Sequence, residues 1–220
     1  MILGIDTATA ATAAAVWAPD GPRLEARDDP EPGARPAHAT RLLALIEEVL
    51  EQAGGWPGIE RIAVGVGPGG FTGLRHGIAT ARALAQGRGL PLIGVSSLHA
   101  LARGAGAPAG TPVYAVIDAR RGEVFAAAWR DDEPLLEARA VAPADLADSL
   151  PPGALAVGDG AVRFREQLER AGAAVPADSS ASHRVSALQV CRLGWAGGTA
   201  DRDAVIPDYR REPDASPRSP

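Results

Sequence analysis

Apolar runs near the start of the chain are separated by polar turns. Residues 2–5 and 11–17 are largely apolar and flank the polar turn Asp6-Thr7-Ala8-Thr9, and residues 23–27 then alternate between charged and apolar positions. This pattern predicts a meander of three consecutive strands.

Helix and strand patterns alternate over the next part of the chain. A broad apolar face recurs at helical spacing between residues 39 and 53, with Glu side chains opposite, and predicts a helix. The pattern then predicts a buried strand, a helix, a buried strand and a short helix, at residues 61–67, 72–86, 91–95 and 97–103. Strands that alternate with helices indicate an α/β fold.

A run of small residues at positions 104–112 is the best candidate boundary between two lobes. We expect an N-terminal lobe over residues 1–106 and a smaller C-terminal lobe over residues 107–210. The charged, proline-rich residues 211–220 are expected to be disordered.

The second lobe also begins with strands. Residues 113–118 and 123–130 are expected to form a hairpin around Arg121-Gly122. The remaining pattern predicts a helix, a strand and two further helices, at residues 144–150, 155–157, 162–171 and 185–195.

Composition excludes several classes of function. The net charge is −5 and the chain has only four Trp, two Tyr and three Phe, which argues against autonomous RNA binding. All 22 basic residues are Arg, so a Walker phosphate loop, a Schiff-base lysine and a Ser-Lys dyad are impossible. The lone Cys191 cannot form an internal disulfide, and no apolar run reaches the roughly 20 residues that span a bilayer. We expect a cytoplasmic protein that does not associate with membranes.

Three motif interpretations fail on inspection. Gly65, Gly67 and Gly70 match the dinucleotide pattern GxGxxG, but no Asp or Glu occurs between Glu60 and Asp118 to bind a ribose. The four His residues lack any metal-ligand spacing, and the Ser96-Ser97 pair lacks a nucleophile elbow. The sequence therefore predicts no cofactor, no metal site and no catalytic residue.

Asp6 ends the first predicted strand immediately before Thr7, and Asp118 ends the first strand of the second lobe. In actin-like and sugar-kinase ATPases, a carboxylate in this position holds metal-bound phosphate. Polar turn residues also routinely satisfy backbone amides. Both interpretations remain open at this point.

One predicted helix has an unusual face. Gly73, Gly77, Ala81 and Ala85 recur every four residues, so another backbone can approach this face closely. Packing on the chain's own sheet would explain the pattern, but five Arg between residues 61 and 103 face no acidic residue of that segment. We therefore favour an interface with another protein.

The chain resembles the TsaB (YeaZ) family over nearly its whole length. The resemblance is carried by the segments ILGIDTAT, GVGPGGFTGLR, LIGVSSL and IDARRGEV, which begin at residues 2, 65, 92 and 117, and by Pro207-Asp208-Tyr209-Arg210. The second and third segments are the most specific.

The resemblance implies an actin-like ATPase (ASKHA) fold, with two lobes that each contain a mixed five-strand sheet with flanking helices, and with the last helix packed back on the first lobe. It implies a non-catalytic scaffold subunit of the tRNA N6-threonylcarbamoyladenosine transferase complex. The subunit would form a heterodimer with the transferase TsaD, work with TsaE in the larger complex and contact tRNA only through that complex. In TsaD a histidine pair binds the active-site metal, whereas the matching positions here are Ser97 and Leu101.

The resemblance also implies a partner interface on the helices of the first lobe. The carried-over interface residues are Leu42, Leu43, Ile46, Phe71, Leu74, Arg75, Ile78 and Arg82. Two positions depart from the family, with Gly70 in place of its usual Ser and His76 in place of an aliphatic residue. On this basis Leu74→Glu is expected to weaken association with TsaD and to leave the fold intact. The same helices could form a homodimer.

The alternative from a different class is an actin-like, ATP-dependent phosphotransferase. Its remnant or active nucleotide site would comprise Asp6, Thr7, Asp118, Gly158, Asp159 and Gly160. The absence of Lys and the short second lobe weigh against it.

Overall fold

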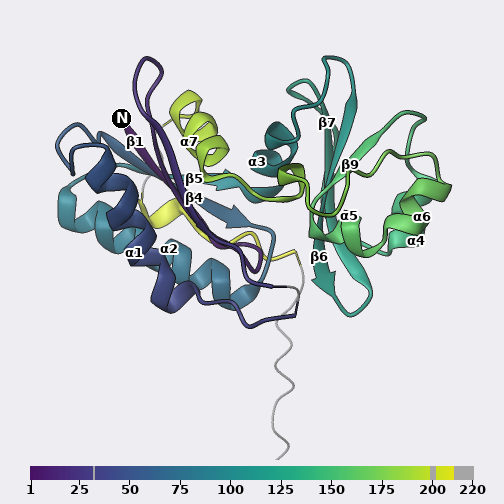
Figure 1. The fold of residues 1–220 in the computed structure, drawn as a ribbon, viewed down its shortest axis with the longest axis horizontal. Coiled ribbons are helices and arrows are strands. Elements are labelled where there is room, and N and C mark those ends of the chain that lie inside the picture. The colour runs from purple at the N-terminus through teal and green to yellow at the C-terminus, as the bar shows by residue number, and fades with distance from the viewer. Residues whose placement is uncertain (32, 199–201, 211–220) are drawn as a thin grey trace, which may run out of the picture.

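Two lobes lie side by side in the structure, a computed structural model that describes residues 1–31, 33–198 and 202–210. Each lobe is built on one mixed sheet (Figure 1). The short helix α3 (Ser97–Gly104) lies at the junction, where it packs against strands of both sheets.

The first sheet has the strand order β3-β2-β1-β4-β5. The central strand β1 pairs antiparallel with β2 and parallel with β4. Every residue of β1 is buried, as expected for a strand covered on both faces. The strands, which match the predicted ones to within one residue at each end, are β1 (Ile2–Asp6), β2 (Thr12–Trp17), β3 (Arg23–Asp28), β4 (Arg61–Gly67) and β5 (Leu92–Ser96).

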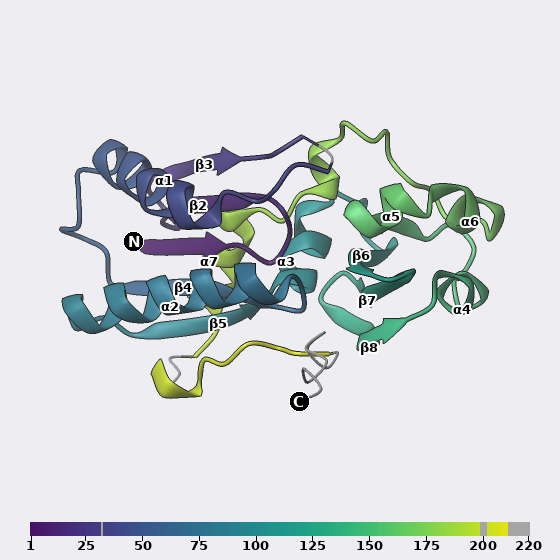
Figure 2. The same cartoon turned by 90° about the horizontal axis from the view of Figure 1, so that it is seen from below.

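Helices cover both faces of this sheet. On one face α1 (His38–Gln52) and α2 (Phe71–Arg88) run side by side and bury a cluster of aliphatic side chains against the strands (Figures 1 and 2). On the other face lie α3 and α7 (Ala187–Ala196). The last long helix of the described chain therefore returns to lobe one.

The small-residue face of α2 packs within the chain itself. A Cβ at Gly73 would lie 2.1 Å from the carbonyl oxygen of Thr7, and one at Gly77 would lie 2.2 Å from Thr7 Oγ1. The Thr7 hydroxyl donates to the Gly73 carbonyl at 2.8 Å. The interpretation of this face as an interface with another protein is therefore wrong, because the β1–β2 turn already occupies it.

The second sheet repeats the topology of the first with the order β8-β7-β6-β9. Its first strand β6 pairs antiparallel with β7 and parallel with β9, as β1 pairs with β2 and β4. The strands are β6 (Pro112–Arg120), β7 (Glu123–Arg130), β8 (Glu133–Val141) and β9 (Leu155–Val157).

Two details of the second sheet differ from the prediction. The described residues form four strands rather than five, and only an isolated parallel bridge from Leu155 to Ala174 lies beyond β9. The edge strand β8 was not predicted. Its side chains are mostly exposed, so the apolar alternation that reveals a half-buried strand is weak there.

The helices of lobe two are short. They are α4 (Pro143–Asp148), α5 (Asp159–Arg163) and α6 (Arg165–Arg170). The continuous helix predicted over residues 162–171 is wrong, because Phe164 (φ −110°, ψ 25°) leaves helical geometry between α5 and α6. Leu146 of α4 and Leu168 of α6 are buried in the apolar cluster between these helices and the sheet.

The described C-terminal segment, residues 202–210, runs along lobe one beside α2 (Figure 2). Arg82 donates hydrogen bonds to the carbonyls of Asp203 and Val205, at 3.2 and 2.6 Å. Arg210 donates to the carbonyl of Ala138 in β8 at 3.0 Å, so the segment touches both lobes. The tail predicted at 211–220 lies outside the described residues. In the described part of the chain, no helix combines the length and apolar character needed to span a membrane.

Candidate binding cleft between the lobes

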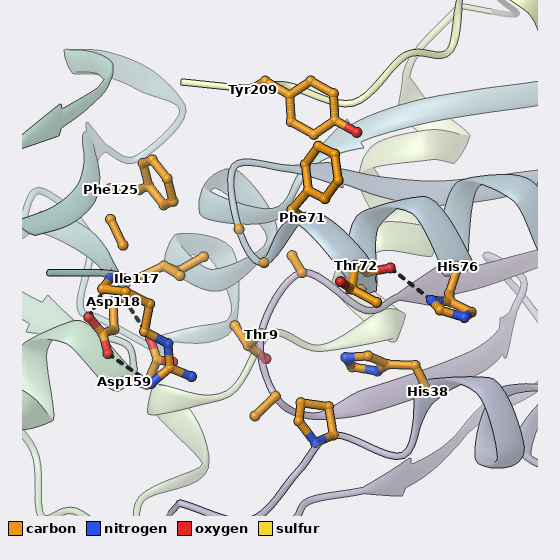
Figure 3. Close-up of a pocket in the computed structure, with 18 of the residues that line it drawn as sticks. Thr9, His38, Phe71, Thr72, His76, Ile117, Asp118, Phe125, Asp159 and Tyr209 are labelled. Carbon is orange, nitrogen blue, oxygen red and sulfur yellow. Dashed lines mark hydrogen bonds and ion pairs between the residues drawn. The ribbon is translucent and has the colours of Figure 1, made fainter. Parts of the chain in front are cut away.

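A cavity of about 650 Å³ lies between the lobes (Figure 3). Lobe one contributes the β1–β2 turn, the entry to α1 and the first turn of α2. Lobe two contributes the end of β6, Phe125 and Asp159, and the C-terminal segment contributes Asp208, Tyr209 and Arg210.

Asp6 ends β1 but is buried and does not line this cleft. The Ser97 hydroxyl donates to Asp6 Oδ2 at 2.6 Å, and the Ala8 amide donates to Oδ1 at 2.9 Å. Burial raises the pKa of Asp6 despite both hydrogen bonds. A Cβ at Gly65 would lie 1.8 Å from Oδ2, so that glycine makes room for the carboxylate. Asp6 thus ties β1 to the junction of β5 and α3.

Asp118 and Asp159 do line the cleft, on the wall formed by lobe two. Asp118 Oδ2 lies 2.7 Å from Arg163 Nη1 and 3.4 Å from Arg120 Nη1. Asp159 Oδ1 accepts a hydrogen bond from the Asp118 amide at 3.0 Å. Burial raises the pKa of Asp159 although this amide hydrogen bond favours its ionised form.

The two glycines beside Asp159 have a packing role. Gly158 has a φ of 113°, and a Cβ there would lie 2.1 Å from the Val116 carbonyl oxygen. A Cβ at Gly160 would lie 2.9 Å from the Ile117 carbonyl carbon. Both positions let α5 approach the backbone of β6, and neither residue lines the cleft.

The predicted nucleotide-site residues are therefore divided between different surroundings. Asp6 and Thr7 are buried in lobe one, whereas Asp118 and Asp159 face the cleft from lobe two. Within the described ranges, no three His, Cys, Asp or Glu side chains are grouped so that they could hold a metal ion. Ser97 and Leu101, at the positions where the resemblance implies metal-binding histidines in TsaD, are both buried.

The predicted interface residues fall into three groups. Four of them are at most 4% exposed in the core of lobe one, namely Leu42, Ile46, Leu74 and Ile78. These side chains cannot contact a partner in this conformation, so their assignment to the surface is corrected. Leu43 is 60% exposed. The expectation that Leu74→Glu leaves the fold intact is wrong, because Leu74 is fully buried.

The other three predicted interface residues contact the C-terminal segment. The ring centroids of Phe71 and Tyr209 are 5.1 Å apart, and the Arg75 guanidinium lies 3.7 Å from the Phe71 ring centroid. Arg75 Nε donates to the Tyr209 hydroxyl at 3.1 Å. Together with the Arg82 contacts, these interactions make the C-terminal segment part of the α2 surface.

Several cleft residues were not predicted from the sequence. His38, at the first position of α1, lines the cleft with Arg35, Thr72, His76 and Phe125. Burial, together with the neighbouring charge of His76, lowers the pKa of His38. A histidine at the start of a strongly amphipathic helix is a local signal, but sequence spacing does not show that these residues meet.

The repeated strand order, with a cleft between the lobes, defines the class of protein as an actin-like ATPase fold. The structure is similar to that of YeaZ from Pseudomonas aeruginosa, with a TM-score of 0.78, 28% identity and coverage of 94% of this chain and 98% of that one. A family model described as TsaD, tRNA N6-adenosine threonylcarbamoyltransferase, matches residues 30–151, more than half of the chain.

Sequence relatives specify the family more closely. The tRNA threonylcarbamoyladenosine biosynthesis protein TsaB of Escherichia coli is 44% identical over 134 residues, which are 60% of this chain and 56% of that protein. The TsaB of Haemophilus influenzae is 42% identical over 42% of this chain and 40% of its own length. An uncharacterised Mycobacterium tuberculosis protein is 37% identical over 98% of this chain and 94% of its own. The chain belongs to the TsaB/YeaZ family. The aligned region spans about half the length of the E. coli and H. influenzae relatives.

Proposed function

We propose that this chain is the non-catalytic scaffold subunit of the complex that forms N6-threonylcarbamoyladenosine in tRNA, and that it binds and supports TsaD. The proposal rests on the hydrogen bonding of the Asp6 carboxylate. Its carboxylate is bonded to Ser97, and Ser97 stands where the resemblance places a metal-binding histidine in the transferase. A lobe organised in this way supplies a folded surface rather than a metal centre.

The partner surface that we propose lies on the α1/α2 side of lobe one. Leu43 is 60% exposed on α1, and Ile206 is 65% exposed in the C-terminal segment beside α2. Exposed apolar side chains with Arg nearby are typical of the centres of protein interfaces. Arg75 supplies such a cation, stacked on Phe71. We propose that TsaD covers this surface, and that a homodimer uses it when TsaD is absent.

The remaining partners follow from the same proposal. TsaE would join the TsaD heterodimer in the larger complex, and tRNA would be contacted through the complex rather than by this chain alone. Because tRNA is the substrate, we propose that the complex acts in the cytoplasm.

A reconstituted modification reaction tests the proposal. Purified TsaD and TsaE, the threonylcarbamoyl-adenylate synthase, ATP, threonine, bicarbonate and tRNA would be mixed with and without this chain, and modified adenosine would be measured. We expect modification to depend on the chain. Full modification without it, together with ATP-dependent phosphoryl transfer by the isolated chain, would instead support the phosphotransferase alternative.

A matched pair of variants tests the surface itself. Leu43→Glu places a carboxylate on α1, and Leu135→Glu makes the same change at an exposed leucine of lobe two that is 42% exposed. We expect Leu43→Glu to weaken TsaD binding about tenfold, equivalent to roughly 1.4 kcal/mol, and Leu135→Glu to leave it unchanged. Equal affinities for both variants would place the interface elsewhere.

A further inference from the structure

The first turn of α2 faces the cleft with uncapped amide groups. Its N-cap residue is Gly70, and neither a capping side chain nor an acidic residue is present in the first turn. The amide of Leu74 makes the first intrahelical hydrogen bond, to the Gly70 carbonyl. The amides of residues 71–73 therefore have no partner within the helix. In an 18-residue helix, these amides form the positive end of the helix dipole.

A buried histidine side chain points to the same place. His38 is only 6% exposed, and its Nδ1 is paired with Thr12 Oγ1 at 2.9 Å. Its Nε2 lies beside the start of α2, 3.0 Å from where a Cβ of Gly73 would be. Figure 3 shows the ring directed into the cavity below Thr72. Where Nδ1 accepts a hydrogen bond from the Thr12 hydroxyl, the neutral imidazole carries its proton on Nε2, from which it can donate a hydrogen bond into the cleft.

The charges of the two cleft walls differ. Among the described residues with which lobe one lines the cleft, none is Asp or Glu, whereas Arg35 and His76 both line it. The opposite wall contains Asp118, which is paired with Arg163, and Asp159, which accepts the Asp118 amide. The third carboxylate of the lining, Asp208, is paired with Arg210. Arg120 and Arg210 also line the cleft, but each lies beside a carboxylate, that of Asp118 or that of Asp208. The donors on the lobe-one wall have no carboxylate beside them in the described lining.

We propose that the cleft wall formed by the first turn of α2 and His38 binds the carboxylate or phosphate group of a small molecule. The uncapped amides and His38 Nε2 would donate to its oxygens, as helix N-termini do to anions elsewhere. A cavity of about 650 Å³ leaves room for the rest of a metabolite-sized ligand, and Phe125 offers an apolar surface across the cavity. This site is independent of the proposed partner role.

Two probes, inorganic phosphate and acetate, test the site on the complete chain. Backbone amide NMR would follow residues 71–73 during each titration, and a thermal-shift series would run alongside. We expect saturable shifts confined to the start of α2 and a melting temperature that rises with anion concentration. Shifts with phosphate alone identify a phosphate-bearing ligand, and shifts with acetate alone identify a carboxylate-bearing one. No saturable shift with either anion would overturn the proposal.

A glycine pair on the same helix supplies the matched variants. A Cβ at Gly70 would meet only the Ala8 oxygen at 3.7 Å, so Gly70→Asp fits and places a carboxylate where the bound anion would lie. Gly87→Asp makes the same charge change near the other end of α2, where a Cβ meets nothing within 4 Å. We expect at least a tenfold loss of anion affinity in Gly70→Asp and no loss in Gly87→Asp. Equal affinity in both would overturn the assignment.

Two substitutions of His38 separate its ring nitrogens. His38→Asn retains a polar group near the position of Nδ1 and removes the donor at Nε2, whereas His38→Gln retains a donor near Nε2. We expect about a tenfold loss of affinity in His38→Asn and a smaller loss in His38→Gln, with the α2 amide spectrum confirming the fold. The opposite order would show that His38 acts only through Thr12, and would remove it from the site.

Discussion

The two lobes share one strand order but use the carboxylate at the end of their first strand differently. In lobe one Asp6 is buried, accepts hydrogen bonds from Ser97 and Ala8, and does not reach the cleft. In lobe two Asp118 faces the cleft and pairs with Arg163 and Arg120. The corresponding carboxylate is thus buried and hydrogen-bonded within lobe one, but forms ion pairs at the cavity wall in lobe two.

This difference shows that topology places a carboxylate but its neighbours decide what it can do. The absence of a side chain at Gly65 lets the Asp6 carboxylate turn inward, because any Cβ there would overlap Oδ2. At Asp118 the guanidinium of Arg163 donates a hydrogen bond to Oδ2 at 2.7 Å. Function must therefore be argued from each site rather than from the fold.

Removal of the buried carboxylate is expected to have the largest effect. Asp6→Ala leaves the Ser97 hydroxyl and the Ala8 amide without their acceptor inside lobe one. We expect a loss of about 2–3 kcal/mol in the free energy of unfolding, measured by urea denaturation. Asp20→Ala, in the exposed β2–β3 turn, is the control and should change stability by less than about 0.5 kcal/mol. Similar losses in the two variants would contradict a structural role for Asp6.

The fold of lobe one was largely predictable, and the reason is visible in particular elements. β4 is a continuous apolar run and α1 has a broad apolar face at helical spacing because both are packed in the core, so their patterns appear in the sequence. β8 is an edge strand with mostly exposed side chains, so its sequence shows little of the apolar alternation that predicts a strand. The same patterns could not distinguish Leu74 in the core from Leu43 at the surface, because both lie on apolar positions of predicted helices.

The cleft was less predictable than the fold. It combines the β1–β2 turn, His38, the start of α2, the end of β6 and the C-terminal segment, which are far apart in the sequence. Asp118 was identified because it ends an apolar strand, and Asp159 because it lies in the Gly158-Asp159-Gly160 segment of the phosphotransferase alternative. His38 was counted only as a scattered histidine, since no periodicity shows that it packs beside Gly73. Side-chain orientation at strand ends, as for Asp6, also lies beyond sequence patterns.

Comparison of the wild-type protein with Asp6→Asn should isolate the contribution of Asp6 to the pH dependence of folding stability. Burial raises the pKa of Asp6 above its ordinary value of 3.8, so the unfolded chain ionises first as the pH rises. Folded wild-type protein therefore loses stability from about pH 4 up to the raised pKa, by at most roughly 1.4 kcal/mol per pH unit. The Asn variant lacks this loss.

Urea denaturation of both proteins at a series of pH values between 4 and 7 measures the difference. We expect wild-type stability relative to Asp6→Asn to fall as the pH rises from 4 toward the raised pKa of Asp6. A relative stability that rises with pH would mean that hydrogen bonds from Ser97 and Ala8 outweigh burial, and that the folded state favours the ionised carboxylate.

The smallest effect is expected at the equivalent position of lobe two. Asp118→Ala removes ion pairs with Arg163 and Arg120, whose side chains are 48% and 72% exposed, and one hydrogen bond from the Arg120 amide. The Asp118 side chain is itself only 8% exposed, but both arginines reach solvent, so we expect a loss of about 1–2 kcal/mol, smaller than that of Asp6→Ala. The loss should shrink further in 1 M salt, because salt screens exposed charges, whereas the loss in Asp6→Ala should not. A salt-independent loss of stability as large as that of Asp6→Ala would show that the first-strand carboxylate has the same structural role in both lobes.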